Sequence, residues 1–126
     1  MTNITYGELT IQTLAMPNTT NPAGDIFGGW IVSQMDLACG VLAKRISKGR
    51  AVTVAIKSMT FYKPVHVGNL VSCYVKPEVI GTTSMTFGVE VWTEALTIDA
   101  RKEKVTKGEF VFVAIDEQGN PRKIEK

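Results

Sequence analysis

Asp25 stands three residues ahead of a glycine pair, Gly28 and Gly29, in the stretch from Asn21 to Trp30. The apolar residues that follow predict a helix that opens at these glycines. The first N–H groups of a helix lack intrahelical partners and carry the positive end of its dipole. A carboxylate beside them can activate water, while the N–H groups stabilise a carbonyl oxygen that becomes negative. We therefore predict an active site here.

Each of these residues also has a purely structural interpretation. An acid is favoured near a helix start without any catalytic duty, so Asp25 alone is evenly balanced between the two. Gly28 and Gly29 would also suit close packing of helix on sheet. Asn21 either orients water or the substrate, or only shapes the turn.

The helix behind the glycines is predicted to run to about Ser47. Lys44 and Arg45 suit the negative end of its dipole, and Gly49 is a natural stop. Its apolar stripe recurs at three- and four-residue spacing and consists of Ile31, Met35, Ala38, Cys39, Leu42, Ala43 and Ile46.

Period-two alternation predicts strands over residues 8–15, 52–62, 70–76, 84–96 and 105–115, with a polar, exposed segment from Thr97 to Lys104. On the second strand, Val52, Val54 and Ile56 share one side. The order of strand, long helix and four strands in meander-like succession predicts an α+β fold, one antiparallel sheet curled around one helix and using both of its faces. We expect a single domain over residues 1–126 with its core at about 8–121. The exposed sheet edge predicts at least a dimer.

Composition excludes several other classes of protein. A formal net charge of +2 on 126 residues is too small to indicate nucleic-acid binding, and no apolar stretch reaches the ~20 residues of a membrane helix. Residues 1–8 lack signal-peptide features, which predicts a cytoplasmic protein. Cys39 and Cys73 have no metal-ligand spacing, so we expect buried, reduced thiols and no metal.

Two further residues compete for a catalytic role. Asp36 lies on the second turn of the helix beside the apolar stripe, and we interpret it as a polar contact at a subunit interface. His66 is the sole histidine and is predicted to be an exposed turn residue away from the Asp25 motif. Without a histidine–acid pair, dehydratase chemistry and a Ser-His-Asp triad are both disfavoured.

Five sequence blocks resemble the bacterial hotdog-fold acyl-CoA thioesterases of the YciA type, and the resemblance as a whole covers the chain from about Leu14 to Pro121. The blocks are Asn21 to Asp36, Gly49 to Val54, Met59 to Gly68, and Gly81 to Ser84 with Val89 to Trp92. The resemblance implies a hotdog fold, in which a curved antiparallel five-stranded sheet wraps around one long central helix. It also implies hydrolysis of acyl-CoA to acid and CoA, and homo-oligomers that are dimers or hexamers, as trimers of dimers. No cofactor is implied, because CoA is part of the substrate.

Carried over by matching motif, the family's catalytic carboxylate falls on Asp25, as general base or as nucleophile through an anhydride. Its helix-start glycines fall on Gly28 and Gly29. Asn21 also matches, whereas Ala23 stands where related sequences often have Asn, which affects the loop and leaves the chemistry in place.

Substrate contacts are predicted more weakly. The CoA contacts are assigned to Gly81, Thr82, Thr83 and Ser84, whose other interpretation is an ordinary hairpin turn. Lys63, Arg50 and the basic residues near Arg101 and Lys104 are phosphate candidates, and a solvated basic face is the competing interpretation. Thr60 either lines the site or satisfies a buried group. The acyl pocket is expected between sheet and helix at the subunit interface, lined partly by Ile26, Phe27, Trp30 and Met59.

Two rival functions stay open at this point. One is a non-catalytic acyl-CoA-binding or sensor protein of the same fold, which the intact acid before the glycine pair disfavours. The other is a hotdog dehydratase. Release of free thiol from an acyl-CoA separates the thioesterase from both.

Overall fold

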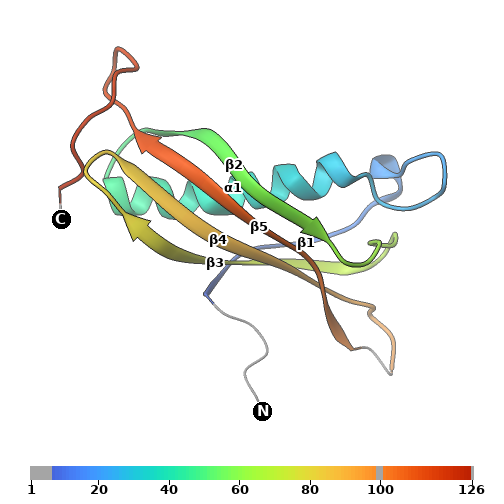
Figure 1. The fold of residues 1–126 in the computed structure, drawn as a ribbon. Helices are drawn as coiled ribbons and strands as arrows, with labels where there is room; N and C mark the ends of the chain where they lie inside the picture. Colours follow the sequence, from blue (N-terminus) through green and yellow to red (C-terminus); the bar gives the residue numbers. More distant parts are fainter. Residues whose placement is uncertain (1–6, 99–100, 126) are drawn as a thin grey trace.

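The structure is a computed structural model that describes residues 7–98 and 101–125. It contains one antiparallel five-stranded sheet and one long helix that lies along the sheet (Figure 1). The elements are β1 (Glu8–Leu14), a short 3-10 helix η1 (Pro17–Thr19), α1 (Gly28–Ser47), β2 (Ala51–Phe61), β3 (Leu70–Ile80), β4 (Ser84–Glu94) and β5 (Lys102–Ala114). The predicted α+β class is confirmed. The predicted domain range also includes residues 1–6, 99–100 and 126, which lie outside the described part.

Helix α1 begins and ends as its sequence predicts. Its buried side chains reproduce the predicted stripe except for Ile46, which is only partly buried, and they include Met35, Ala38 and Cys39 at 0% exposure. The helix stops at Ser47 because Lys48 adopts the left-handed conformation, with φ 57°. The turn therefore falls on a lysine, one residue ahead of the predicted glycine stop.

The predicted strand succession is wrong in one respect. The order across the sheet is β1-β3-β4-β5-β2, so only β3, β4 and β5 form a meander. Strand β2 pairs with β5 at the far edge, from Ala51 opposite Ala114 to Phe61 opposite Thr106. Residues 62–69 then carry the chain across the end of the sheet to β3, next to β1. Alternation identifies strands but not their neighbours, which is why the sequence missed this crossover.

Three strand boundaries also differ from the prediction. Strand β3 continues to Ile80, past Pro77, and its register against β4 shifts between Pro77 and Val79. Such an irregularity accommodates a proline within a ladder. Strand β4 ends earlier, at Glu94, and β5 begins earlier, at Lys102, so the end of the polar segment from Thr97 to Lys104 belongs to a strand.

The core lies between α1 and the sheet, and it leaves one apolar face open. Phe87 and Phe110 are fully buried, and the Phe87 and Phe112 rings meet edge-on with centroids 5.9 Å apart. Leu37 and Val41 of α1 and Ile56 of β2 lie on this open face and are 41–58% exposed. The expectation that one chain covers both faces of the helix is therefore wrong. Among the described residues, no helix is long and apolar enough to span a membrane.

Val52 and Val54 of β2 are exposed as well, but the bulges in β2 set Ile56 opposite the buried Phe110 and Val52 opposite Val113, on the other side of the strand. The prediction that Val52, Val54 and Ile56 share one side is therefore wrong.

Candidate functional site

The turn before α1 is held together by Asn21. Its side-chain Oδ1 accepts hydrogen bonds from the backbone N–H of Ala23 at 2.9 Å and of Asp25 at 3.1 Å. Its backbone N–H donates to the carbonyl of Asp25 at 2.7 Å. Gly24 completes the turn at φ 89°, which favours glycine. Asn21 therefore shapes this turn, and the Asp25 backbone is fixed by it.

The start of α1 leaves backbone donors open. Phe27 is the N-cap and makes no side-chain capping bond, while its carbonyl accepts from Trp30 N–H at 3.0 Å. Within residues 7–98 and 101–125, neither Gly28 nor Gly29 N–H has an acceptor. These groups carry the positive end of the helix dipole, so they are suited to bind a negatively charged oxygen.

Asp25 and Gly28 line the same pocket, which has a volume of about 200 Å³. The side chain of Asp25 is 40% exposed. A Cβ at Gly28 would meet only the Phe61 ring, at 3.9 Å. The pocket is lined by Asn21, Asp25, Ile26, Gly28, Ile31, Phe61, Lys63, Pro64, Val65 and Thr106.

His66 contradicts its prediction by lying beside Asp25. Its Nδ1 is 3.4 Å from Asp25 Oδ1, and its side chain is 62% exposed as expected. The crossover after β2 brings it there, because the carbonyl of Val65 accepts from Ile26 N–H at 2.9 Å just ahead of the helix. A histidine–acid pair is thus present, so its supposed absence no longer argues against dehydratase chemistry. The apolar Val65 next to the histidine is buried, and an apolar residue at this place was a sequence signal that the crossover packs on the core.

The rival carboxylate, Asp36, occupies a different position. It lines a groove of about 500 Å³ between α1 and β2 on the open apolar face, together with Leu37, Val41 and Val52. The hydroxyl of Thr53 donates to Asp36 Oδ1. An acid on an apolar face needs such a partner when the face is covered.

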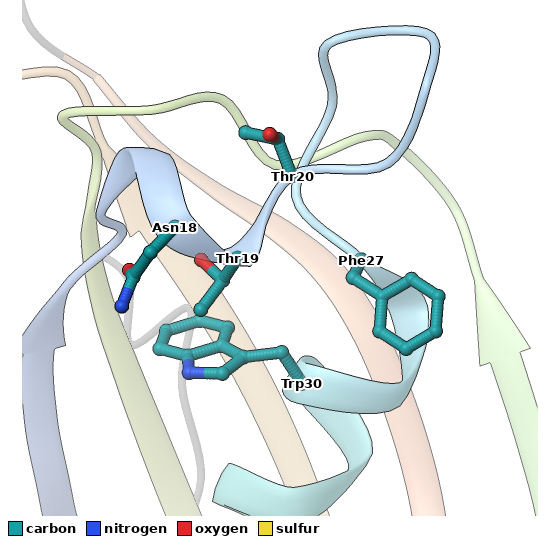
Figure 2. A pocket seen from close by; sticks show the side chains of 5 residues that line it. All are labelled: Asn18, Thr19, Thr20, Phe27 and Trp30. Atoms are coloured by element: carbon teal, nitrogen blue, oxygen red, sulfur yellow. The ribbon is translucent and has the colours of Figure 1, made fainter.

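The aromatic candidates lie on a third pocket, of about 440 Å³, formed with Asn18, Thr19 and Thr20. Figure 2 shows Trp30 lying beneath Thr19 and Phe27 pointing away from Trp30. Phe27 is 57% exposed, and its ring lies 2.9 Å from where a Cβ of Gly29 would stand. Gly29 therefore makes room for this ring. Of the other expected acyl-pocket residues, Ile26 is buried and Met59 is partly buried.

The predicted CoA-binding residues do not gather around Asp25 within one chain. Gly81, Thr82 and Thr83 join β3 to β4, whose first residue is Ser84, and this hairpin lies near the C-terminal end of α1 (Figure 1). A 20-residue helix is about 30 Å long, so the hairpin is far from the start of α1. The carbonyl of Thr82 accepts from Ile124 N–H and that of Thr83 from Ala114 N–H. The hairpin interpretation therefore accounts for this segment within the chain.

The basic candidates and Thr60 divide in a similar way. Lys63 lines the Asp25 pocket and pairs with Glu103 at 3.2 Å. Lys104 pairs with Glu90, whose side chain is 6% exposed, at 3.4 Å. Thr60 is exposed on β2 and does not line the pocket, whereas its neighbour Phe61 does.

Both cysteines are free and fully buried, as predicted. Burial raises the pKa of Cys73 to about 12. The pKa of Cys39 is raised further, first by burial and then by the charges of Asp36 and Cys73. Across residues 7–98 and 101–125, no group of three or more His, Cys, Asp or Glu side chains is placed to hold a metal ion.

Comparison with known proteins places this geometry in a family. Residues 23–100 match the model of the thioesterase superfamily. The acyl-CoA thioester hydrolase YciA of Salmonella typhimurium is 47% identical over 124 residues, which are 97% of this chain and 93% of that protein.

Two solved structures are similar throughout. The hexameric thioesterase from Yersinia pestis superposes with a TM-score of 0.92 at 44% identity, covering 98% of this chain and 99% of that one. A hexameric broad-specificity acyl-coenzyme A thioesterase gives a TM-score of 0.92 at 45% identity, covering 98% of this chain and 85% of that one. This chain therefore belongs to the thioesterase superfamily and, within it, to the YciA-type acyl-CoA thioester hydrolases.

Proposed function

We propose that this protein hydrolyses acyl-CoA thioesters to a free carboxylic acid and CoA. The observation that carries this proposal is the uncapped start of α1, where the Gly28 and Gly29 N–H groups lack acceptors and a carboxylate shares the pocket. The near-full-length identity to the Salmonella typhimurium hydrolase supports the same reaction. The step needs no cofactor, since water is the only co-reactant.

In the proposed reaction, the thioester carbonyl oxygen lies against the open N–H groups of Gly28 and Gly29. A water molecule gives a proton to a carboxylate as its oxygen bonds to the carbonyl carbon. The negative charge that develops on the carbonyl oxygen is stabilised by the N–H groups and the helix dipole. The C–S bond then breaks, and CoA leaves as the thiol after taking up a proton.

Asp25 is our first candidate for the carboxylate, because it shares the pocket of Gly28. It acts as general base or, by direct attack, as a nucleophile that forms an anhydride. Asp36 is the rival candidate, because it lies in the larger groove on the open apolar face, which offers apolar contacts to an acyl chain. Asn21 holds the Asp25 turn in either case.

For substrate binding, we propose Phe27 and Trp30 as apolar contacts and Lys63 as a phosphate contact. Thr60 and the hairpin residues Gly81, Thr82, Thr83 and Ser84 do not line the Asp25 pocket, and we propose that another copy of the chain brings them to the substrate.

We also propose that the protein is a homo-oligomer, a dimer that assembles into a hexamer. An exposed apolar face such as that of α1 and β2 is typical of an interface with another chain. Strand β2 also lies at the edge of the sheet, where its outer backbone groups can pair with another strand. Light scattering tests this by comparing the particle mass with the 13.8 kDa of one chain. Ile56→Lys on the open face should lower that mass, whereas Lys57→Ala beside it should not.

The activity is tested by thiol release from a panel of acyl-CoA esters of different chain length. The proposal predicts turnover of at least part of the panel, with stoichiometric free acid. Binding of every ester without cleavage would favour the non-catalytic acyl-CoA-binding protein. Hydration of an enoyl-CoA without thiol release would favour the dehydratase, for which His66 beside Asp25 is the specific observation.

A further inference from the structure

The pocket of Asp25 contains one polar group that the proposed reaction has not yet used. Thr106, on β5, is 0% exposed and lines this pocket. Its Oγ1 is the one buried side-chain oxygen or nitrogen in the described part of the chain that lacks a hydrogen-bond partner. Buried hydroxyls in folded proteins are nearly always satisfied, so an orphan one calls for an explanation.

The surroundings of Thr106 leave only one direction for a partner. Its neighbours across the ladders are Phe61 on β2 and Val91 on β4, and neither side chain can hydrogen-bond. The remaining side is the pocket, whose walls nearby are Ile26, Ile31 and Val65. A small molecule that enters the pocket would therefore reach this hydroxyl.

We propose that Thr106 is a positioning residue that holds the attacking water in the pocket of Asp25. A volume of about 200 Å³ is ample for one or more water molecules, each of which needs about 30 Å³. Such a water would be bound by the Thr106 hydroxyl on one side and by a carboxylate oxygen on the other. The two hydrogen bonds fix its position, and the carboxylate accepts its proton. The apolar walls disfavour other sites for that water.

This inference rests on the proposed hydrolysis and adds one step to it. The Thr106 hydroxyl either accepts one hydrogen bond from the water or donates one to it, and no proton is transferred between them. The water proton goes to the carboxylate, the water oxygen bonds to the carbonyl carbon, and CoA leaves. Loss of the hydroxyl should therefore slow attack by water on the thioester but not attack by other small nucleophiles.

The test compares Thr106→Val, which keeps the shape and removes the hydroxyl, with Thr106→Ser, which keeps the hydroxyl. We expect kcat to fall about tenfold in Thr106→Val, the effect of losing one hydrogen bond, with KM little changed. Thr106→Ser should stay within about threefold of the wild type, well below that effect. Thr93→Val, at another buried threonine on β4 that does not line the pocket, serves as the matched control.

The ratio of the products formed with two competing nucleophiles distinguishes positioning of water from a purely structural role, because a structural role of Thr106 would leave this ratio unchanged. With hydroxylamine added, the acyl group is divided between the free acid and the hydroxamate. Thr106→Val should shift the product ratio toward hydroxamate by about the factor lost in hydrolysis, and Thr106→Ser should not shift it. The melting temperature of Thr106→Val should not fall, because the orphan hydroxyl gains nothing from the protein itself.

Three outcomes would overturn the inference. One is unchanged kcat with a raised melting temperature in Thr106→Val, which would mean that the hydroxyl is an unused buried group. Another is an equal loss of hydrolysis and hydroxylaminolysis, which would mean a general disturbance of the site. The third is a wild type that cleaves no acyl-CoA, which overturns the proposed hydrolysis and with it the role of Thr106; the first two outcomes overturn the role of Thr106 alone.

Discussion

The C-terminal end of α1 is closed by the protein itself, whereas its N-terminal end is left open. Arg122 donates from Nη1 to the carbonyl of Ser47 at 2.9 Å, and from Nη2 to the carbonyl of Arg50 at 3.2 Å. Gly49 gives the guanidinium room, since a Cβ there would stand 2.6 Å from Nη2. At the other end, no side chain caps the helix, and the Gly28 and Gly29 N–H groups have no acceptor among the described residues.

The difference separates a helix end that the protein closes from one that the proposed function assigns to the substrate. Both ends present orphan backbone groups by the geometry of any helix. At the C-terminal end the carbonyl of Lys44 accepts from the backbone N–H of Gly49 and that of Ser47 from the half-buried Arg122, and these bonds contribute to stability. At the N-terminal end no group of the described residues satisfies the open N–H groups. In the proposed function the substrate takes that place, and the contact contributes to binding and rate. Substitutions at the two ends should accordingly change different quantities.

The largest effect is expected from Gly28→Pro. Proline is tolerated at the first position of a helix, Gly28 does not need a positive φ, and Phe27 already has the extended backbone that precedes proline. The substitution removes one N–H, so kcat should fall about 10²- to 10³-fold, as for other oxyanion donors. Gly28→Ala keeps the N–H and should retain most activity in the same thiol-release assay. Equal activity of both variants would exclude the Gly28 N–H from the reaction.

At the closed end, Arg122→Ala should lower stability and spare the chemistry. It removes charged hydrogen bonds to the carbonyls of Ser47, Arg50 and Ile115, which together should cost about 2 kcal/mol or more in the free energy of unfolding. Urea denaturation measures the loss, and kcat per folded molecule should be unchanged. Arg122→Lys keeps the charge without the fork of donors and should recover only part of the stability. A large fall in kcat without a loss of stability would contradict the distinction between the two ends.

His66→Gln tests how much of the open end is essential. The imidazole is 3.4 Å from Asp25 and largely exposed, so we expect thiol release to stay within about tenfold of the wild type, below the usual effect of losing a general acid or base. The measurement is kcat/KM for one good acyl-CoA substrate. Abolished activity in this variant would make His66 a catalytic partner of Asp25 and would revive the dehydratase alternative.

The smallest effect is expected at the cysteines, which lie on the core side of the helix and sheet. With a pKa of about 12, the Cys73 thiol is almost wholly protonated at pH 8, and the raised pKa of Cys39 has the same consequence. Since the thiolate is the reactive form, a thiol reagent should label neither cysteine in the native protein. In denaturant, where the pKa returns to about 8.5, both should react. Rapid labelling of the native protein would show that the core opens at this place.

The sequence predicts the elements of this fold better than their neighbours. Periodicity located all five strands and the helix, and the glycine pair located the helix start at Gly28. Alternation has no information on pairing, so the place of β2 beside β5 could not be predicted. The same limit hid His66, because its position depends on the crossover at the end of the sheet.

The site was predicted where its residues are local in sequence. Asn21, Asp25 and Gly28 meet because one turn joins them, whereas Phe61 and Thr106 reach the pocket from β2 and β5. A threonine in an alternating strand resembles any other strand threonine. Only the packing of α1 on β5 makes Thr106 buried and leaves its hydroxyl without a partner.

The most direct test of the account is thiol release by the wild type, Asp25→Asn and Asp36→Asn, each checked for fold and for CoA binding. The account predicts that Asp25→Asn loses most of kcat, by about 10²-fold or more, and that Asp36→Asn retains more. The reverse order would transfer the general base to Asp36 and the apolar groove. Full activity in both variants would contradict a carboxylate-driven hydrolysis at the open end of α1.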